Sequence, residues 1–500
     1  MHAPRTDAAT PLYDIAGIRR MEAQAIAALG GDGFILMQRA GAAAWRFLLE
    51  HWPEARRIVV AAGPGNNGGD GYVLARHAHE AGRAVHVLHA PGQEPRSVLA
   101  RRASEAFVAA GGRVLVADAD PVLPACDLVV DALFGIGFDG GAESAGGALL
   151  AAVAACEDAV FALDVPSGVD ASSGDVPGTA VRAERTLQFL GDHAGLATGA
   201  ALDHVGCLET ASLDVPEQAS EGVQPVAWRL SAAALAGLLP RRARTAHKGV
   251  AGHVLVAGGE HGTGGAALLA AAAALRAGAG LVSVATRGAH VAALLARTPE
   301  AMAHAVDDPA DVAPLVAAAD VCAVGPGLGR GGWGEGMLAA AVDGGRALVL
   351  DADALNLLAA APRVLPADTV LTPHPGEAAR LLACTVREVE RDRVAAAHAL
   401  CARHGCVTVL KGAGTVVAAP DGRVWIIDAG NPGMAVGGMG DALTGVVAAL
   451  RAQGLPAAEA AAAGALQHAV AGDRAAAAGG ARGLLPSDLI AALRMPGEDG

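Results

Sequence analysis

Residues 431–445 read Asn431-Pro-Gly-Met-Ala-Val-Gly-Gly-Met-Gly-Asp-Ala-Leu-Thr-Gly445 and carry the strongest signal in the chain. Three glycines, Gly437, Gly438 and Gly440, precede an apolar run, which predicts a helix whose first turn leaves backbone N–H groups free. These groups and the positive end of the helix dipole form a cradle for an anion. Asp441 stands where it could deprotonate a hydroxyl that attacks a phosphorus atom in that cradle. The stretch therefore predicts phosphoryl transfer, with close packing of a Gly-rich helix as the alternative.

Upstream of this stretch, short apolar runs alternate with segments of helical spacing. This alternation is typical of a parallel sheet covered by helices. The predicted strands are His253–Ala257, Leu281–Ala285, Val321–Val324, Ala347–Asp351, Val370–Thr372 and Val407–Lys411. A hairpin follows them, with strands at Thr415–Ala419 and Val424–Ile427.

The loops after these strands carry the groups that a nucleotide needs. Lys411 follows one strand directly and opens the loop Lys411-Gly412-Ala413-Gly414-Thr415, which offers an ammonium, backbone N–H groups and a hydroxyl to a phosphate. His374 lies between two prolines, which stiffen its loop. Two glycine-rich loops, 258–266 and 325–329, allow the backbone to approach a ligand closely. A lone Lys is more often a solvated surface charge, and a lone His is usually structural.

The N-terminal half shows the same alternation of strands and helices, which predicts a doubly wound parallel sheet. Helical spacing covers residues Ile18–Leu29 and Ile35–Glu50. The predicted strands are Arg57–Ala62, Val85–His89, Val114–Val116, Leu128–Asp131 and Val160–Asp164.

A glycine-rich loop, Gly63-Pro-Gly-Asn-Asn-Gly-Gly-Asp-Gly71, follows the first of these strands and opens a helix. It contains G-x-G-x-x-G, but the second strand ends at His89 without the acidic residue that holds a ribose in dinucleotide folds. No Gly-Lys-Ser/Thr follows, which excludes a P-loop. The loop is interpreted as a backbone nest with free carboxamides and Asp70; simple helix capping is the alternative.

Two other strand ends carry oxygen-bearing side chains. Asp131 begins Asp-Ala-Leu-Phe-Gly-Ile-Gly, and Asp164 begins Asp-Val-Pro-Ser-Gly-Val-Asp, which contains Ser167. Parallel strands bring these loops to the same sheet edge as Asn66–Asp70. Oxygen ligands suit a hard cation rather than zinc. Three such loops together predict a site, although a single Asp at a strand end is usually a helix cap.

Composition excludes several classes of protein. The 500 residues are 53% hydrophobic and 3% aromatic, and they contain 67 glycines and 7 cysteines. A formal net charge of −14 argues against sequence-independent binding to nucleic acid. The cysteines contain no CxxC, so reduced thiols in a cytoplasmic protein are expected. Residues 1–11 lack the features of a signal peptide, and the apolar stretch Ala266–Ala285 divides into helix, turn and strand, so no membrane span is predicted.

These patterns predict an α/β chain with two three-layer domains. The polar stretch between Val215 and Trp228 resembles a linker, and the predicted domains are residues 1–222 and 223–500. The N-terminal domain is expected to be a Rossmann-like doubly wound sheet.

Residues 11–215 resemble the NAD(P)H-hydrate epimerase family in the three loops described above. The resemblance implies that the hydrated dinucleotide contacts Asn66, Asn67, Gly68, Gly69, Asp70, Gly135, Ile136, Gly137, Phe138, Asp139, Gly140, Gly141 and Asp164. It also implies a potassium ion held by Asn67, Asp131 and Ser167. Two features depart from the family: the loop after Asp131 lacks an Arg that is common there, and His193 stands where a Lys is common. The reaction inverts C6 of the hydrated ring and needs a proton shuttle, for which Asp164 is the candidate acid/base.

Residues 241–489 resemble the ribokinase-like fold, and more narrowly the ADP-dependent NAD(P)H-hydrate dehydratases. The resemblance implies that Ala266, Gly327, His374 and Asp441 contact the hydrated dinucleotide, with Asp441 catalytic. It assigns the adenylate to Lys411, Gly412, Ala413, Gly414, Thr415 and Gly440. The family phosphorylates the C6 hydroxyl with ADP, or with ATP in eukaryotes, and loss of phosphate restores the dihydronicotinamide. Magnesium is expected with the nucleotide.

The favoured hypothesis is therefore a bifunctional repair enzyme of hydrated NADH and NADPH. One alternative is a ribokinase-like kinase of a small molecule fused to a nucleotide-binding domain. Another makes the N-terminal domain a non-catalytic binding module, which Asp131, Asp164 and Ser167 disfavour. The partners expected are small molecules and further copies of the chain in a homo-oligomer, rather than nucleic acid or membrane.

Overall fold

The computed structural model describes residues 8–137, 146–239 and 242–494, and the chain divides into two compact units. The first unit is Pro11–Ala227, and the second is Trp228–Gly500 together with Met1–Thr10. The division lies slightly beyond the boundary expected at residue 222. The reason is that Val223 is buried against Ile18 and Met21 of the first unit.

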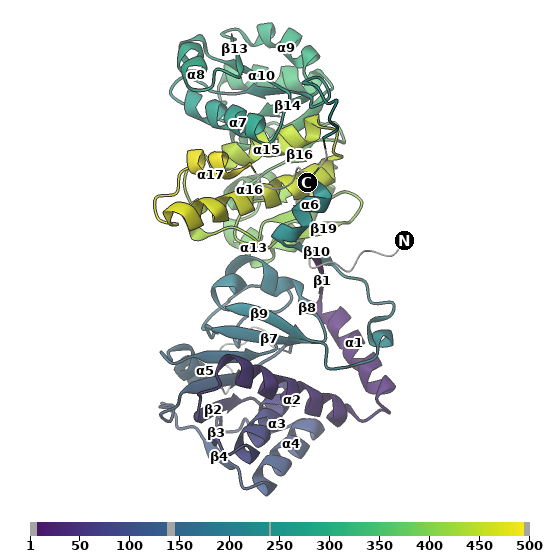
Figure 1. The fold of residues 1–500 in the computed structure, drawn as a ribbon, viewed down its shortest axis with the longest axis vertical. Helices are drawn as coiled ribbons and strands as arrows, with labels where there is room; N and C mark the ends of the chain where they lie inside the picture. Colours follow the sequence, from purple (N-terminus) through teal and green to yellow (C-terminus); the bar gives the residue numbers. More distant parts are fainter. Residues whose placement is uncertain (1–7, 138–145, 240–241, 495–500) are drawn as a thin grey trace. The chain divides into compact units, whose positions relative to one another are not determined.

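The first unit contains a seven-stranded sheet in the order β4-β3-β2-β5-β6-β7-β9 (Figure 1). All of its neighbouring strands are parallel. The strands are β2 (Arg57–Ala62), β3 (Ala84–His89), β4 (Arg113–Val116), β5 (Leu128–Ala132), β6 (Val160–Leu163), β7 (Arg185–Phe189) and β9 (Cys207–Ala211). A short parallel pair, β1 (Ala9–Tyr13) with β8 (Asp192–His193), is not part of this sheet and positions His193 opposite Tyr13.

Helices cover both faces of this sheet and give the expected three layers. They are α1 (Ile15–Ala28), α2 (Gly33–His51), α3 (Asn66–Glu80), α4 (Val98–Ala109) and α5 (Gly147–Ala154). One core joins α2, α3 and α4 to the sheet through residues such as Phe47, Tyr72 and Phe107. A second core places Leu149 and Leu150 of α5 against the opposite face. The doubly wound architecture that the sequence predicts is confirmed.

The second unit contains a sheet whose strands follow the order β13-β12-β11-β14-β15-β16-β17-β18-β19-β10. The strands from β13 to β17 are parallel, and β18 is antiparallel to both of its neighbours. The strands are β10 (Ala227–Leu230), β11 (His253–Ala257), β12 (Leu281–Thr286), β13 (Met302–Ala305), β14 (Val321–Val324), β15 (Ala347–Leu350), β16 (Val370–Leu371), β17 (Val407–Leu410), β18 (Val416–Ala418) and β19 (Val424–Ile427). The hairpin is therefore confirmed.

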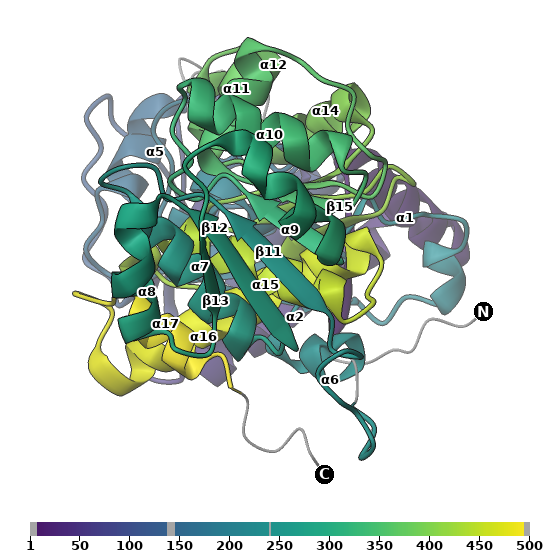
Figure 2. The ribbon, with the colours of Figure 1, turned by 90° about the horizontal axis from the view of Figure 1, so that it is seen from above.

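Two layers of helices enclose this sheet as well. Figure 2 shows α10, α11 and α12 on one side of the sheet, and α7, α15, α16 and α17 on the other. The helices of the unit are α6 (Leu235–Leu238), α7 (Gly264–Arg276), α8 (Val291–Arg297), α9 (Ala313–Ala318), α10 (Gly332–Asp343), α11 (Ala352–Ala360), α12 (Pro375–Leu382), α13 (Val386–Arg391), α14 (Arg393–His404), α15 (Met439–Ala452), α16 (Ala457–Gly479) and α17 (Pro486–Ala492). The Ala-rich segments at residues 457–465 and 475–478 are parts of one helix, α16.

Two expectations about the whole chain can be compared with the described residues. Within residues 8–137, 146–239 and 242–494, no helix is both long enough and apolar enough to cross a bilayer. All seven cysteines are described, and each is a free thiol.

Close packing of small residues stabilises the second unit, and Gly445 provides a test. A Cβ atom at Gly445 of α15 would lie 2.1 Å from the carbonyl oxygen of Ala270 in α7. We predict that Gly445→Ala lowers the free energy of unfolding by about 2 kcal/mol, because overpacking outweighs the gain of about 1 kcal/mol in helix propensity. Urea denaturation measures the change. Gly237→Ala in α6, where a Cβ meets nothing within 4 Å, is the control and should be neutral or more stable by up to about 1 kcal/mol; equal midpoints for the two variants would contradict the packing argument.

Candidate functional site

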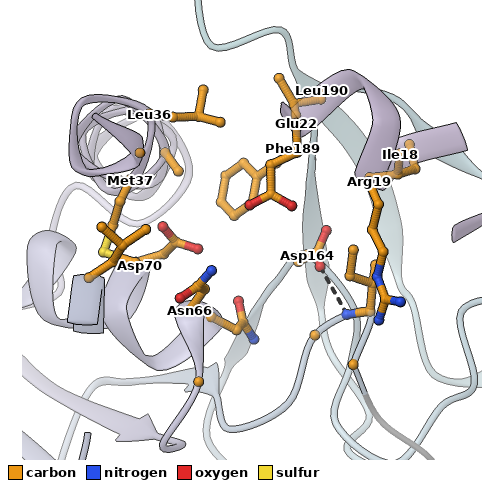
Figure 3. Close-up of a pocket in the computed structure, with 18 of the residues that line it drawn as sticks. Ile18, Arg19, Glu22, Leu36, Met37, Asn66, Asp70, Asp164, Phe189 and Leu190 are labelled. Atoms are coloured by element: carbon orange, nitrogen blue, oxygen red, sulfur yellow. Dashed lines mark hydrogen bonds between the residues drawn. The ribbon is translucent and has the colours of Figure 1, made fainter. Parts of the chain in front are cut away.

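A cavity of about 430 Å³ opens at the carboxyl edge of the first sheet (Figure 3). The sequence-predicted residues that line it are Asn66, Asn67, Asp70, Gly135, Ile136, Gly137 and Asp164. Residues 138–141, also predicted to bind the substrate, lie outside the described part of the chain. Gly68 and Gly69 do not line the cavity: they lie in the first turn of α3, where a Cβ would meet the backbone of Gly63 or the side chain of Met37.

The loop before α3 does not use its polar side chains as caps. The N-cap of α3 is Gly65, and no side chain caps this helix end. Asn67 instead donates from Nδ2 to the carbonyl oxygen of Leu163 at 3.2 Å, and its buried Oδ1 has no hydrogen-bond partner. The capping alternative is therefore wrong for this segment, and Oδ1 of Asn67 is left without a hydrogen-bond partner in the described part of the chain.

Asp164 is the residue on which the loops of this site converge. Its backbone adopts a left-handed conformation, with φ at 65°, which a non-glycine residue holds only when its surroundings impose it. One carboxylate oxygen, Oδ2, accepts a hydrogen bond from the backbone of Ile136 at 3.2 Å. The other, Oδ1, lies 3.0 Å from Nε2 of His193. Gly135 is required beside it, because a Cβ there would lie 2.8 Å from Oδ2.

His193 orients Asp164 from behind the cavity. Its ring is fully buried, and its backbone N–H donates to Oε1 of Gln188 at 2.7 Å. The other ring nitrogen, Nδ1, is buried without a partner. The buried ring is thus fixed against the carboxylate of Asp164.

Asp131 and Ser167 form a buried pair, and Oγ of Ser167 accepts a hydrogen bond from the backbone of Phe134, which lines the cavity. Ser167 donates to Asp131 through both Oγ, at 2.6 Å, and its backbone N–H, at 2.8 Å. Burial raises the pKa of Asp131 to about 6, against the effect of these hydrogen bonds. The hydrogen bonds of Asp131 come from Ser167 and the backbone of Leu133, and no basic side chain among the described residues pairs with its carboxylate. Oxygen donors of this kind suit a hard cation.

In the second unit, the predicted nucleotide residues meet at the carboxyl ends of β15, β16 and β17. Lys411 directly follows β17, and its Nζ lies 2.5 Å from Oδ1 of Asp351 and 3.7 Å from Oε2 of Glu377. Oδ2 of Asp351 accepts a hydrogen bond from Thr444 of α15 at 2.8 Å. A Cβ at Gly440 would lie 3.2 Å from Nζ of Lys411, so this glycine lets the helix N-terminus approach the ion pair.

Asp441 stands in the first turn of α15, beside this cluster. Burial raises its pKa to about 6, and the negative charge of Asp351 adds to the effect while Lys411 opposes it. Its pKa is thus poised near neutrality, as a general base requires. Among the described residues, no three His, Cys, Asp or Glu side chains are grouped to enclose a metal by themselves.

The remaining predicted residues lie in the segments that follow β11, β14, β16 and β17. Gly327, with φ at 57°, follows β14, and its carbonyl oxygen accepts a hydrogen bond from Thr263 at 2.8 Å. The loops after β11 and β14 are therefore bound together next to Ala266 of α7. His374 caps α12, because its Nδ1 accepts from the backbone of Gly376 at 2.9 Å. Thr415 closes its own loop by donating to the carbonyl oxygen of Gly412 at 3.0 Å.

Sequence reasoning missed several residues that shape the two sites. The sequence pattern gives Asp351 only as the end of a predicted strand and Glu377 only as part of the loop around His374. The signal that could have found both is that carboxylates follow consecutive strands. Arg393 is almost fully buried and donates to the carbonyl oxygens of Leu410 and Lys411, which holds the Lys411 loop in place. Nothing in its local sequence indicates this role.

Comparison with known proteins gives both units a family. Residues 33–195 match the family described as YjeF-related protein N-terminus, and residues 254–494 match NAD(P)H-hydrate dehydratase. The bifunctional NAD(P)H-hydrate repair enzyme Nnr of Coxiella burnetii is 45% identical over 486 residues, covering 97% of this chain and 99% of that protein. The chain belongs to the bifunctional NAD(P)H-hydrate repair enzymes.

Further relatives agree. The repair enzyme Nnr of Escherichia coli is 43% identical over 478 residues, covering 95% of this chain and 92% of that protein. A solved ribokinase-like superfamily protein from Enterococcus faecalis has 31% identity and a TM-score of 0.50, and covers 53% of this chain and 93% of that one. The expected ribokinase-like fold and the bifunctional repair enzyme are thus confirmed. The first unit is the epimerase and the second the dehydratase, and a kinase with a non-catalytic module is not favoured.

The hydroxyl of Thr444 provides a test of the Asp351 cluster. We predict that Thr444→Val lowers the free energy of unfolding by about 1–3 kcal/mol, because the buried carboxylate of Asp351 loses a hydrogen bond. Chemical denaturation measures the change. Thr408→Val is the matched control: Thr408 is equally buried but its hydroxyl has no partner, so this variant should be neutral or more stable. The same loss in both variants would show that Asp351 does not depend on Thr444.

Proposed function

We propose that the two repair activities depend on two carboxylates, Asp164 for epimerisation and Asp441 for dehydration. The observation that supports this most strongly is the placement of each at a convergence of loops. Asp164 lines the cavity of the epimerase unit and is fixed by Ile136 and His193. Asp441 stands at the N-terminus of α15, beside Lys411.

In the epimerase, the reacting atom is C6, a carbon that carries both a hydroxyl and the ring nitrogen. Loss of water or ring opening, followed by addition from the other face, inverts it, and either route moves a proton at the hydroxyl. Asp164 is the acid/base for that proton, and His193 fixes its orientation. Asn66, Asn67 and the backbone of residues 135–137 line the same cavity and hold the substrate.

In the dehydratase, ADP is the proposed phosphoryl donor to the C6 hydroxyl, and loss of phosphate then restores the dihydronicotinamide. Asp441 removes the proton from that hydroxyl. Lys411 and the free N–H groups at the start of α15, near Gly440, hold the phosphate. The loop at Lys411–Thr415 binds the adenylate.

Magnesium fits the dehydratase site as a shared ligand of protein and nucleotide. Three carboxylates, Asp351, Glu377 and Asp441, surround the single ammonium of Lys411, so negative charge is in excess there. Glu377 and Asp441 would hold the ion together with phosphate oxygens, since Mg²⁺ in nucleotide sites commonly takes one or two carboxylates. When bound, it supplies charge neutralisation at the transferred phosphoryl group.

A potassium ion fits the epimerase site at Asn67, Asp131 and Ser167. The support is the orphaned Oδ1 of Asn67 and the unbalanced charge of Asp131. A cation there would anchor the loops after β2, β5 and β6, and so hold Asp164 in place. The small molecules of the reaction remain the proposed partners, and a cytoplasmic homo-oligomer remains a prediction.

Exchanging each carboxylate separates the two activities. Asp164→Asn is predicted to abolish interconversion of the R and S epimers while dehydration of the S epimer continues. Asp441→Asn should do the reverse, because the two residues lie in different units. Chromatography of the epimers without ADP measures the first activity, and near-UV absorbance with S epimer, ADP and magnesium measures the second. Wild-type epimerisation in Asp164→Asn removes Asp164 from the mechanism, and wild-type dehydration in Asp441→Asn does the same for Asp441.

The potassium site predicts a pH-dependent effect on stability. The pKa of Asp131 is about 6 in the fold, against an ordinary value of 3.8. Above pH 6 the ionised carboxylate therefore lowers the free energy of unfolding by about 3 kcal/mol, and below pH 4 this cost is absent. We therefore expect KCl, relative to choline chloride, to raise the melting temperature of the epimerase unit at pH 7.5 and to raise it much less at pH 5.

Calorimetry at equal ionic strength measures this difference. The Asp131→Asn variant should lose the potassium effect, whereas the exposed control Asp158→Asn should keep it. An effect of the same size in Asp131→Asn would place the cation elsewhere.

A further inference from the structure

Helix α1 contributes a carboxylate to the epimerase cavity that neither the glycine-rich loops nor the family comparisons assign. Glu22 lines the cavity with Asp70 and Asp164, and Figure 3 shows the three carboxyl groups turned towards the same space. The three come from different elements: α1, α3 and the end of β6. Arg19, one turn before Glu22, is the single basic side chain among the described residues that line the cavity.

The surroundings of Glu22 give its carboxylate no structural role. Its carboxylate makes no hydrogen bond or ion pair with any residue in the described part of the chain. Its neighbours in the wall of the cavity include the apolar Ile18, Phe189 and Leu190. A half-buried carboxylate in such a place loses hydration without gaining a partner, which is unfavourable unless a ligand supplies the contact.

The carboxylates also differ in how readily they ionise. Burial raises the pKa of Glu22, as does the charge of Asp164, while Arg19 lowers it. The pKa of Asp70 is raised well above its usual range by burial and by the charges of Asp164 and Glu22. The raised pKa of Asp70 favours its protonated form, in which the carboxyl group can donate a hydrogen bond to an amide carbonyl. The carboxyl group of Glu22 lines the cavity without a partner in the described part of the chain, so it is free to give and take a proton.

We propose that Glu22 is a second catalytic acid/base of the epimerase, and that it acts on the face of the hydrated ring opposite Asp164. The inference rests on the role proposed for Asp164. Inversion of a carbon that exchanges its hydroxyl requires a proton donor on the side of departure and a proton acceptor on the side of attack. A cavity with two carboxylates on separate elements supplies both.

The atoms balance in this scheme. Protonated Glu22 gives its proton to the C6 hydroxyl, the C6–O bond breaks, and water leaves with the bonding electrons. The lone pair of N1 forms the N1=C6 double bond. A second water then attacks C6 from the other face, its oxygen forms the new bond while the π electrons of N1=C6 return to N1, and its proton passes to ionised Asp164. The reverse reaction uses the two carboxyl groups in exchanged roles, and solvent at the open cavity resets their protons between turnovers in one direction.

Kinetics of the full chain without ADP test the proposal, with pure R or S NADH hydrate and chromatography of the epimers. Glu22→Gln is expected to lower kcat at least about 100-fold in both directions, with KM within about threefold, because general acid/base catalysis contributes at least that factor. Glu22→Asp should recover part of the activity. Glu105→Gln, an exposed position on α4, is the matched control and should behave as wild type.

The outcomes separate this inference from the proposal on which it rests. Loss of activity in Asp164→Asn but wild-type kcat in Glu22→Gln overturns the role of Glu22 alone, and a matching loss in Asp70→Asn would then assign the partner to Asp70. Full activity in Asp164→Asn overturns the earlier proposal. A second measurement does not depend on any variant: wild-type epimerisation in H₂¹⁸O should place one ¹⁸O at C6 for each inversion, and retention of the original oxygen overturns the scheme.

Discussion

Negative charge gathered at the carboxyl edge of each parallel sheet is the constraint on which both sites depend. In the dehydratase, Asp351, Glu377 and Asp441 surround Lys411. The ion pair between Lys411 and Asp351 joins the ends of β17 and β15, and Thr444 connects Asp351 to α15. In the epimerase, Glu22, Asp70 and Asp164 share one cavity above the buried Asp131. Charge of this density is stable only where hydrogen bonds, ammonium groups or ligands balance it.

Despite this excess of carboxylates, an acidic chain can bind an anionic dinucleotide. In the proposed binding mode its phosphates need no basic surface, because backbone N–H groups at glycine-rich helix starts would provide the contacts. The glycines serve this purpose by removing side chains where backbones converge, as at Gly135 beside Asp164 and at Gly440 beside Lys411. Burial raises the pKa of two of the carboxyl groups, Asp131 and Asp441, to about 6, and for Asp441 a value near neutrality suits acid/base chemistry.

Much of this arrangement could be predicted from the sequence, because buried parallel strands are short apolar runs with a loop at a defined end. The strands at His253–Ala257 and Val321–Val324 agree with their predicted limits. Residues Asn66–Asp70 at the start of α3 and the loop Lys411–Thr415 follow the carboxyl ends of β2 and β17, where parallel topology places them. The family resemblance in those loops is confirmed by relatives over nearly the whole chain.

The rest depends on contacts between segments distant in sequence. Glu22 reaches the cavity only because α1 packs next to it, and the periodicity of a helix does not tell which surface it covers. Arg393 supports Lys411 from a neighbouring helix, and its local sequence resembles an ordinary exposed arginine. The strands β7 and β9 were missed because their polar residues, such as Gln188 and Glu209, interrupt the apolar pattern.

The most direct measurement of the central claim uses one mixture of R and S NADH hydrate with the full chain, magnesium and ADP. The account predicts complete recovery of the near-UV absorbance of NADH, since the epimerase unit converts the R form to the S form that the dehydratase unit consumes. Recovery that stops near the S fraction, apart from slow spontaneous epimerisation, would contradict an active epimerase site. No recovery at all would contradict the repair function of this chain.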